Sequence, residues 1–368
     1  MKINLFKLMH GCCAPDAGTL VNTTQNYVNA YDGSTTAFAA PNDLSSLMKT
    51  YYDTELLENA RPNLIHAQFA RKQPLPKGRG KKVEWRKFNT LADASALTEG
   101  VIPTGQKFGQ SSMTASILQY GTYLTVSDQL ELHAIDNVIL SATEELGASA
   151  GTTQDKLVRD TLAAGTTVQY CDKVSTAGAH TAVETRAGMD ATSKLTPTEV
   201  NKAVTTLKKL KAPTINGKYV AIIHPSVSYD LRENKEWIEA HKYAAVTPLF
   251  TGEIGELHGV RFIETTEAKI WNNNTCPVKT AAGSGGTPAA TYYSVYSTLF
   301  LGKDAFGMID PEGGGLEMIV KSKEQAGGPL NQFSTLGYKF STATKILYQD
   351  RMVRVESLSE YSGTDEAN

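Results

Sequence analysis

One histidine stands where an α/β enzyme could place a general base. His224 and Pro225 follow an apolar run, residues 219–223, that reads as a buried strand. A histidine at the end of such a strand can accept or donate a proton near neutral pH. No nucleophile is evident from adjacency in the sequence, so we interpret His224 as a turn histidine. An α/β enzyme that uses His224 stays open as an alternative.

The remaining groups that could do chemistry are carboxylate pairs and scattered cysteines. Glu144 with Glu145, and Asp310 with Glu312, could model an acid–base pair, but we interpret them as a solvated helix face and a turn. Sequence motifs for a phosphate-binding loop, a serine nucleophile elbow, a zinc protease and an EF-hand are absent. No C-x-x-C spacing occurs among the four cysteines, Cys12, Cys13, Cys171 and Cys276. We therefore predict no enzyme, no cofactor and no metal site.

Composition indicates a globular protein without a bias toward nucleic acids or membranes. The 368 residues include 36 basic and 38 acidic ones, for a formal net charge of −2, and 41% are hydrophobic. No apolar run reaches the roughly eighteen residues of a membrane-spanning helix. A local basic cluster could bind phosphate, but we favour edge-protecting lysines or ion-pair partners of a neighbouring chain. The cluster comprises Lys72, Lys77, Arg79, Lys81, Lys82, Arg86 and Lys87.

The most informative segment is a long excursion between two strand patterns. Residues 83–88 alternate apolar and polar side chains, and residues 113–124 carry apolar side chains among threonines and serines. Residues 91–110 join them, although hairpin loops usually have about 2–5 residues. An isolated two-stranded ribbon is only marginally stable in water, so we expect this one to lie on another surface. A floppy surface hairpin is the alternative.

A long amphipathic helix is predicted over residues 136–164. Asp136 is a suitable N-cap and Gly165 a natural stop. At about 1.5 Å per residue the helix would span roughly 40 Å, although Gly147 and Gly151 weaken its middle by roughly a kilocalorie each. We interpret it as an organising strut. Its apolar positions at helical spacing include Ile135, Ile139, Leu146, Leu157 and Leu162.

The second half of the chain predicts an α/β domain. A helix begins at Thr196, with Pro197 at its first position and Glu199 placed for a capping box. Residues 272–290 are rich in Gly, Ala, Ser and Thr and read as a protruding loop. Strands fit residues 219–223, 260–264, 292–300 and 316–320.

Both ends of the chain have patterns of their own. Residues 11–41 are small and polar, typical of an arm that orders only on a partner, and a helix is predicted over 42–60. Near the other end, residues 338–348 and 352–358 are predicted to form the last strand pair. The polar tail from Ser359 is predicted to be frayed.

This order of parts resembles the major capsid proteins of tailed bacteriophages, with the Hong Kong 97-type shell fold, and more closely the capsid family of N4-like phages. The resemblance spans roughly residues 41–270, and its motifs are specific as a set. They are Pro41-Asn42-Asp43-Leu44-Ser45-Ser46-Leu47, Lys49-Thr50-Tyr51-Tyr52-Asp53, Leu56-Leu57-Glu58-Asn59-Ala60, Glu84-Trp85-Arg86-Lys87-Phe88, Leu97-Thr98-Glu99-Gly100-Val101, Gln119-Tyr120-Gly121, Ser127-Asp128, Val158-Arg159-Asp160, Tyr219-Val220-Ala221-Ile222-Ile223-His224-Pro225, Gly252-Glu253-Ile254-Gly255 and Gly259-Val260-Arg261-Phe262.

The resemblance implies an α+β fold with five parts. Residues 1–70 would be an N-terminal arm, and residues 71–124 an extended loop lying over the neighbouring subunit. Residues 125–195 would form a peripheral domain around a spine helix, residues 136–164. Residues 196–323 would form an axial domain with the loop 272–290, and residues 324–368 would return to the peripheral domain.

The same resemblance implies a structural subunit whose partners are copies of itself. Hexamers and pentamers would build an icosahedral head in the host bacterial cytoplasm, with scaffolding and portal proteins and an optional decoration protein. The precursor shell would expand during maturation, and the head would enclose double-stranded DNA with non-specific contacts. The implied inter-subunit residues of the extended loop are Trp85, Arg86, Phe88, Leu97, Val101, Ile102 and Phe108. An encapsulin-like nanocompartment shell of the same fold is the alternative.

Overall fold

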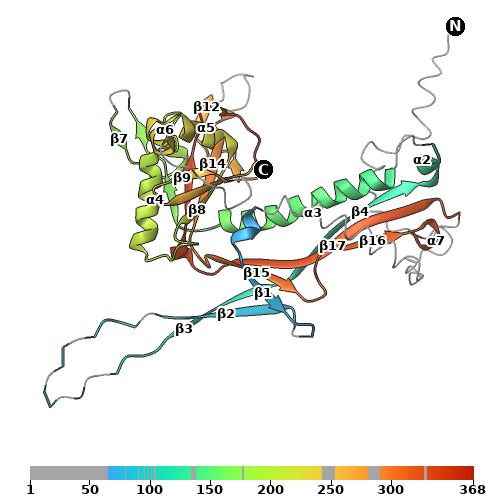
Figure 1. Ribbon diagram of the computed structural model, residues 1–368, viewed down its shortest axis with the longest axis horizontal. Helices are drawn as coiled ribbons and strands as arrows, with labels where there is room; N and C mark the ends of the chain where they lie inside the picture. The colour runs from blue at the N-terminus through green and yellow to red at the C-terminus, as the bar shows by residue number, and fades with distance from the viewer. Residues whose placement is uncertain are drawn as a thin grey trace, which may run out of the picture. The chain divides into compact units, whose positions relative to one another are not determined.

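Figure 1 presents the computed structural model of the chain. The described residues are 65–78, 80–89, 91–94, 96–97, 99–100, 102, 105–133, 138–175, 178–242, 253–280, 291–326 and 330–368. The predicted helix over residues 42–60 and nearly all of the predicted arm lie outside them. So do the individual residues Cys12, Cys13, Arg79, Val101, Ile135 and Asp136.

The chain divides into two compact units built from segments that are distant in the sequence. Unit 1 comprises Met1–Leu64, Leu118–Gln154 and Pro311–Thr342. Unit 2 comprises Ile65–Ile117, Asp155–Asp310 and Ala343–Asn368. Two elements, helix α3 (Val138–Ala163) and strand β17 (Phe333–Ile346), contribute residues to both units.

A five-stranded sheet runs along β17, with order β1-β15-β17-β16 and β4 also pairing with β17. Within unit 1, β4 (Leu118–Ser127) is antiparallel to β17, and β16 (Glu317–Lys321) pairs with the same part of β17. A Cβ atom on Gly337 would lie 2.7 Å from Cβ of Tyr123 and 2.8 Å from the carbonyl oxygen of Thr122. Glycine at this position therefore permits the close approach of β4 and β17.

Helix α3 starts and ends close to the predicted bounds of 136–164. Within unit 1 its Ser149 hydroxyl lies 3.2 Å from the hydroxyl of Tyr338 on β17, so the helix covers this face of the sheet. Gly147 and Gly151 are buried, as is Ala150. Both glycines are therefore accommodated inside the helix despite their low helix propensity.

Unit 2 contains a seven-stranded sheet with order β5-β18-β14-β8-β10-β9, in which β11 also pairs with β14. Its central strands β8 and β14 are buried along their whole length, as a doubly covered sheet requires. The predicted strands 219–223 and 260–264 are confirmed as β8 and β10, which pair in parallel. The bounds are β5 Val168–Tyr170, β18 Met352–Ser357, β14 Val295–Leu301, β8 Tyr219–Ile223, β10 Val260–Glu264, β9 Glu253–Leu257 and β11 Ile270–Trp271.

Three helices accompany this sheet: α4 (Pro197–Lys209), α5 (Pro225–Glu233) and α6 (Lys235–Lys242). Thr196 is the N-cap residue of α4 as predicted, but its side chain makes no capping hydrogen bond. The predicted capping box is therefore wrong. The Glu199 carboxylate instead accepts hydrogen bonds from Lys202 and Gln169, which leaves it unable to reach back to the cap.

The predicted strand pair near the C-terminus is also wrong. β17 ends at Ile346, the 3-10 helix η5 (Gln349–Arg351) follows, and β18 enters the other sheet between β14 and β5. All six residues of β18 are buried, which suits a strand with neighbours on both edges. The end of the chain thus shares a sheet with β8 and β14.

The remaining elements are short. The 3-10 helix η3 (His66–Phe69) precedes β1 (Arg71–Leu75), which pairs with β15 (Phe306–Pro311). None of the described helices is long and apolar enough to cross a membrane. The others are α2 Asp128–His133, β6 Lys173–Val174, β7 His180–Thr181, η4 Arg186–Gly188, β12 Val278–Thr280, β13 Thr291–Tyr292 and α7 Lys323–Ala326.

The tail from Ser359 is docked on unit 2 and not frayed, which corrects the prediction. The Asp365 carboxylate accepts a 2.6 Å hydrogen bond from the Tyr296 hydroxyl, and the Asp365 carbonyl accepts a 2.7 Å bond from Ser294. The Asn368 side chain accepts from the Ile270 amide at 3.0 Å. A polar composition alone suggested disorder, but these side chains satisfy polar groups of the sheet edge.

Acid is expected to destabilise unit 2 through His224 and Asp365. Burial lowers the pKa of His224 below its ordinary 6.5. Burial acts to raise the pKa of Asp365, but hydrogen bonds from Ser362 and Tyr296 outweigh it and lower this pKa. Both folded-state pKa values lie below the unfolded ones, so the unfolded chain binds protons more readily as the pH falls. Thermal melting should therefore show stability declining from about pH 6.5 downward.

The matched variant for this prediction is His224→Asn. Asparagine keeps an acceptor at the N-cap position of α5 but does not titrate, so the melting temperature should depend less on pH just below neutrality. An unchanged pH profile in this variant would contradict the role given to His224.

Candidate inter-subunit surface

Strands β2 (Lys82–Phe88) and β3 (Gln110–Ser116) form a two-stranded antiparallel hairpin (Figure 1). Among the described residues, neither strand pairs with a third. The pairing continues past the strands, because the Asn89 amide donates to the Gly109 carbonyl at 2.9 Å. Closer to the tip, the Gln106 side chain donates to the Ala92 carbonyl at 3.1 Å. The predicted ribbon is therefore present and extends beyond its regular strands. Its predicted second strand, residues 113–124, is corrected: the ribbon uses β3, whereas residues from Leu118 onward belong to β4 and pair with β17.

The base of the hairpin packs on its own chain. Trp85 and Val83 lie against a small buried cluster that includes Ile117, Ile309 and Ala343. A Cβ atom on Gly307 would lie 3.3 Å from the ring of Trp85, so glycine makes room for the indole. This contact holds the base of the ribbon against the rest of unit 2.

We interpreted the aromatic residues of β2, Trp85 and Phe88, as one face that docks on protein, and the structure corrects this because they lie on opposite faces. Trp85 is half-buried and points into the cluster, whereas Phe88 is 57% exposed. Phe88 stacks on Phe108 across the hairpin, with 4.8 Å between ring centroids. Alternation along a strand places residues three positions apart on opposite faces, so this difference was already contained in the sequence spacing.

The far part of the hairpin carries large apolar side chains exposed to solvent. Ile102 is 93% exposed, Leu97 75% and Phe108 64%. Soluble proteins seldom expose several large apolar groups together unless another surface covers them. The far part of the ribbon therefore has the composition of a contact surface.

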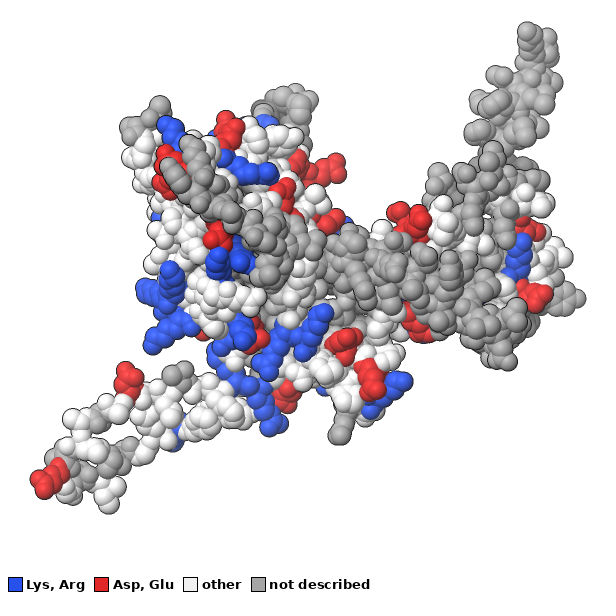
Figure 2. All heavy atoms as spheres, viewed as in Figure 1, with Lys and Arg blue, Asp and Glu red and all other residues white. Residues whose placement is uncertain are grey.

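Basic side chains surround the base of the hairpin (Figure 2). Lys87 on β2 lies 4.0 Å from Asp350 and 4.8 Å from the centroid of the Tyr348 ring, on which Arg351 also stacks. Arg86, on the opposite face of β2, is exposed and pairs with Glu84 at 3.4 Å. The described members of the predicted basic cluster thus occupy a solvated surface, and two of them have acidic partners within the chain.

The predicted packing positions of the long helix have unequal environments. Leu146 and Leu162 are fully buried, while Ile139 and Leu157 are half-buried. Val158 is fully buried as well. Ile135 lies outside the described residues.

The catalytic alternatives find little geometric support. The Nδ1 atom of His224 accepts the Ser226 amide at 3.2 Å and caps helix α5, so that nitrogen already serves the fold. Glu144 and Glu145 are both exposed on α3, as the solvated-face interpretation expected. Cys171 and Cys276 are buried free thiols.

One structural contact of the hairpin region was missed by sequence reasoning. His66, just before β1, and Asp155 in α3 are both fully buried and paired, with 2.6 Å between Nδ1 and Oδ2. The Asp155 carboxylate also accepts the His66 backbone amide at 2.8 Å. The partners are 89 residues apart, and no local pattern links them.

Comparison with known proteins decides what kind of protein carries this ribbon. A family model described as phage capsid protein matches residues 110–339, more than half of the chain. The chain belongs to the phage capsid protein family. It is therefore a capsid protein, a structural component of the virion, and copies of it assemble into the capsid. No curated protein sequence matches the chain.

Solved structures confirm the predicted α+β Hong Kong 97-type fold. The capsid of Ralstonia phage GP4 is similar with a TM-score of 0.56 at 12% identity, covering 79% of this chain and 87% of that one. The Cyanophage Pam1 capsid gives 0.56 at 12% identity, covering 90% and 97%. The Cyanophage P-SCSP1u capsid gives 0.54 at 15% identity, covering 79% and 87%.

Proposed function

We propose that this capsid protein is the shell-forming subunit of an N4-like phage head, assembled as hexamers and pentamers around double-stranded DNA. The observation that carries the proposal is the β2–β3 hairpin, whose apolar far part no described residue of the chain covers. The hairpin of one copy lies on a different surface of the next copy. Such head-to-tail contacts close into rings when the rotation between copies fits.

Burial of the tip supplies much of this contact. Leu97, Ile102 and Phe108 are largely exposed in the single chain. Fully burying side chains of this size contributes about 1.5–3 kcal/mol each before association costs are subtracted. A ring repeats the contact at every subunit, so a modest net gain per hairpin suffices for a stable shell.

The segments of the chain take the roles that the resemblance implies. Residues 71–124 act as the extended loop, α3 as the spine helix with its buried leucines, and residues 196–323 as most of the axial domain. Strand β18 joins this axial set, because it pairs with β14 in the sheet that contains β8. The resemblance assigns four more residues of the same loop to the contact between subunits: Trp85, Arg86, Phe88 and Val101.

The basic surface at the hairpin base suits a contact with negative charge. Lys72, Lys81 and Lys82 are exposed around it. Exposed lysines attract DNA phosphates without reading sequence, and they also suit acidic side chains of a neighbouring copy. Scaffolding, portal and decoration proteins, and assembly in the bacterial cytoplasm, complete the proposal by resemblance.

Electron microscopy of particles made by the full chain tests the assembly. Expression of the chain alone or with its scaffold should yield closed icosahedral shells built of five- and six-membered rings. Heads from the infected host should contain DNA and one portal vertex. Small closed shells that hold an enzyme and lack a portal would favour the nanocompartment alternative, and a stable monomer under all conditions would overturn the proposal.

A further inference from the structure

Three potential metal ligands converge beside β5, although the sequence predicted no metal site. They are Asp172 just after β5, His180 in β7 and Glu199 in the first turn of α4. One ligand atom from each lies within 4.8 Å of the other two. The set comes from three separate elements, so the fold, and not a local sequence motif, brings the donors together.

The position between the carboxylates already holds a positive charge. The Lys202 ammonium donates to Glu199 at 2.9 Å and to Asp172. The Glu199 carboxyl is buried in the first turn of α4, where the helix dipole favours a negative charge. The site is therefore built to accommodate a cation.

The ammonium group of Lys202 can move away from the two carboxylates. Lys202 is 45% exposed and stands on a flexible stem three residues along α4 from Glu199. The Lys202 ammonium bridges the two carboxylates. Among the described residues, no hydrogen bond or ion pair joins this ammonium to the exposed side chain of His180. A metal ion at the same place would use all three donors, which an ammonium ion does not.

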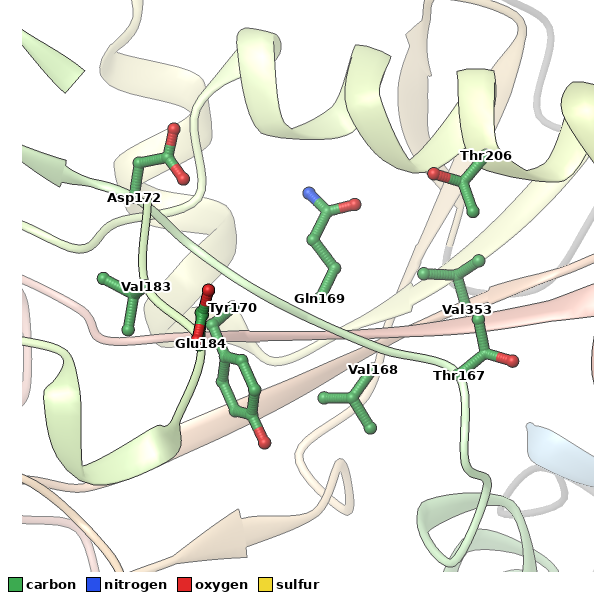
Figure 3. Close-up of a pocket in the computed structure, with 9 residues that line it drawn as sticks. All are labelled: Thr167, Val168, Gln169, Tyr170, Asp172, Val183, Glu184, Thr206 and Val353. Atoms are coloured by element: carbon green, nitrogen blue, oxygen red, sulfur yellow. The ribbon is translucent and has the colours of Figure 1, made fainter. Parts of the chain in front are cut away.

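A solvent-accessible pocket borders one of the three donors, Asp172. It has a volume of about 480 Å³ and is lined by Asp172, Gln169, Tyr170, Glu184 and Thr206, among others. Figure 3 shows Asp172 and Gln169 directed to the side on which helix α4 and Thr206 lie. The pocket therefore gives solvent access to Asp172.

We propose that Asp172, His180 and Glu199 bind a zinc-class divalent ion that displaces the ammonium of Lys202. One imidazole nitrogen and two carboxylates suit Zn²⁺, which takes such ligands at roughly 2.0–2.2 Å. Mg²⁺ and Ca²⁺ prefer all-oxygen sets. The bound ion links the β6–β7 hairpin to helix α4. This site is independent of the shell contact made by the β2–β3 hairpin.

Calorimetric titration of the metal-stripped full chain with ZnCl₂ tests the proposal. One ion should bind per chain, and MgCl₂ should produce no comparable signal. His180→Ala removes an exposed ligand without disturbing the core. Loss of a residue that only orients a metal ligand weakens binding by roughly 10–100-fold, so loss of a direct ligand should weaken zinc binding by more than that. Lys202→Met removes the competing ammonium and should tighten binding by up to roughly fivefold.

The matched control is His258→Asn. His258 is exposed in a turn with positive φ, which asparagine tolerates, and it lies outside the ligand set. Zinc binding should be unchanged in this variant. Binding that is equally tight in the parent and in His180→Ala, or no binding by the parent at all, overturns the proposal.

Discussion

Replacing Leu97, Ile102 and Phe108 together by serine is expected to abolish shell formation while the subunit stays folded. These side chains are exposed in the single chain, so their loss removes little that stabilises the monomer; surface substitutions usually stay within about 0.5 kcal/mol. In the shell, the same change removes roughly 5–9 kcal/mol of gross apolar burial per hairpin. Since each 1.4 kcal/mol is about a factor of ten, the contact should be lost.

Particle yield by sedimentation and subunit stability by thermal melting separate the two effects. Leu330→Ser is the matched control, because Leu330 is also strongly exposed, at 74%, but lies outside the hairpin in unit 1. This control should assemble. Normal shells from the triple variant would remove the hairpin tip from the proposed contact, and a lowered melting temperature would show that the tip packs on its own chain.

Trp85 provides the opposite case on the same strand. Its indole packs on the cluster around Ile309 and beside Gly307 within one chain. Trp85→Ala should therefore lower the melting temperature of the subunit. Because Trp85 is only half-buried, the free energy of unfolding should fall by less than the roughly 3–5 kcal/mol found for buried tryptophans. Any loss of shells in this variant would follow from a loosened hairpin base, whereas the tip variants should affect assembly alone.

Local patterns predicted an element well where a local physical reason requires that element. Strand β8 is an unbroken apolar run that only a doubly covered strand accommodates, and its bounds were found to the residue. Helix α4 starts where proline at the first helical position requires it. The ribbon β2–β3 was evident because its connection is too long for an ordinary hairpin loop.

Predictions failed where distant segments decide the outcome. β17 and β18 are close in sequence, yet each finds a better partner in a different sheet. The tail is polar, but Asp365 and Asn368 meet unsatisfied groups of unit 2. The faces of Trp85 and Phe88 are the exception, because strand alternation alone would have separated them.

The pair of His66 and Asp155 leads to the second large prediction, in which Asp155→Ala destabilises unit 2 strongly. Both side chains are fully buried, and the Asp155 carboxylate binds the ring and the backbone amide of His66. Removing one partner of a buried pair leaves the other without compensation and costs about 3–5 kcal/mol. At roughly 2–4 °C per kcal/mol in a domain of this size, the melting temperature should fall by about 10 °C.

Two further variants on the same residue and helix make the result specific. Asp155→Asn keeps an acceptor for the His66 amide and should cost less than alanine. Glu144→Ala removes a carboxylate that is exposed on the same helix, so its loss should cost no more than about 0.5 kcal/mol. If Asp155→Ala and Glu144→Ala melt alike, the buried pair contributes nothing beyond an ordinary surface charge.

The consequence for assembly follows from where the pair lies. His66 lies in η3, which is followed by β1 and then by the hairpin strand β2, while Asp155 stands on α3. The pair therefore ties the segment that leads into the ribbon to helix α3 within unit 2. A subunit that loses this tie holds its hairpin less firmly, and ordering the hairpin then costs more at every contact. Asp155→Ala should consequently reduce shell yield even at temperatures where the subunit remains folded.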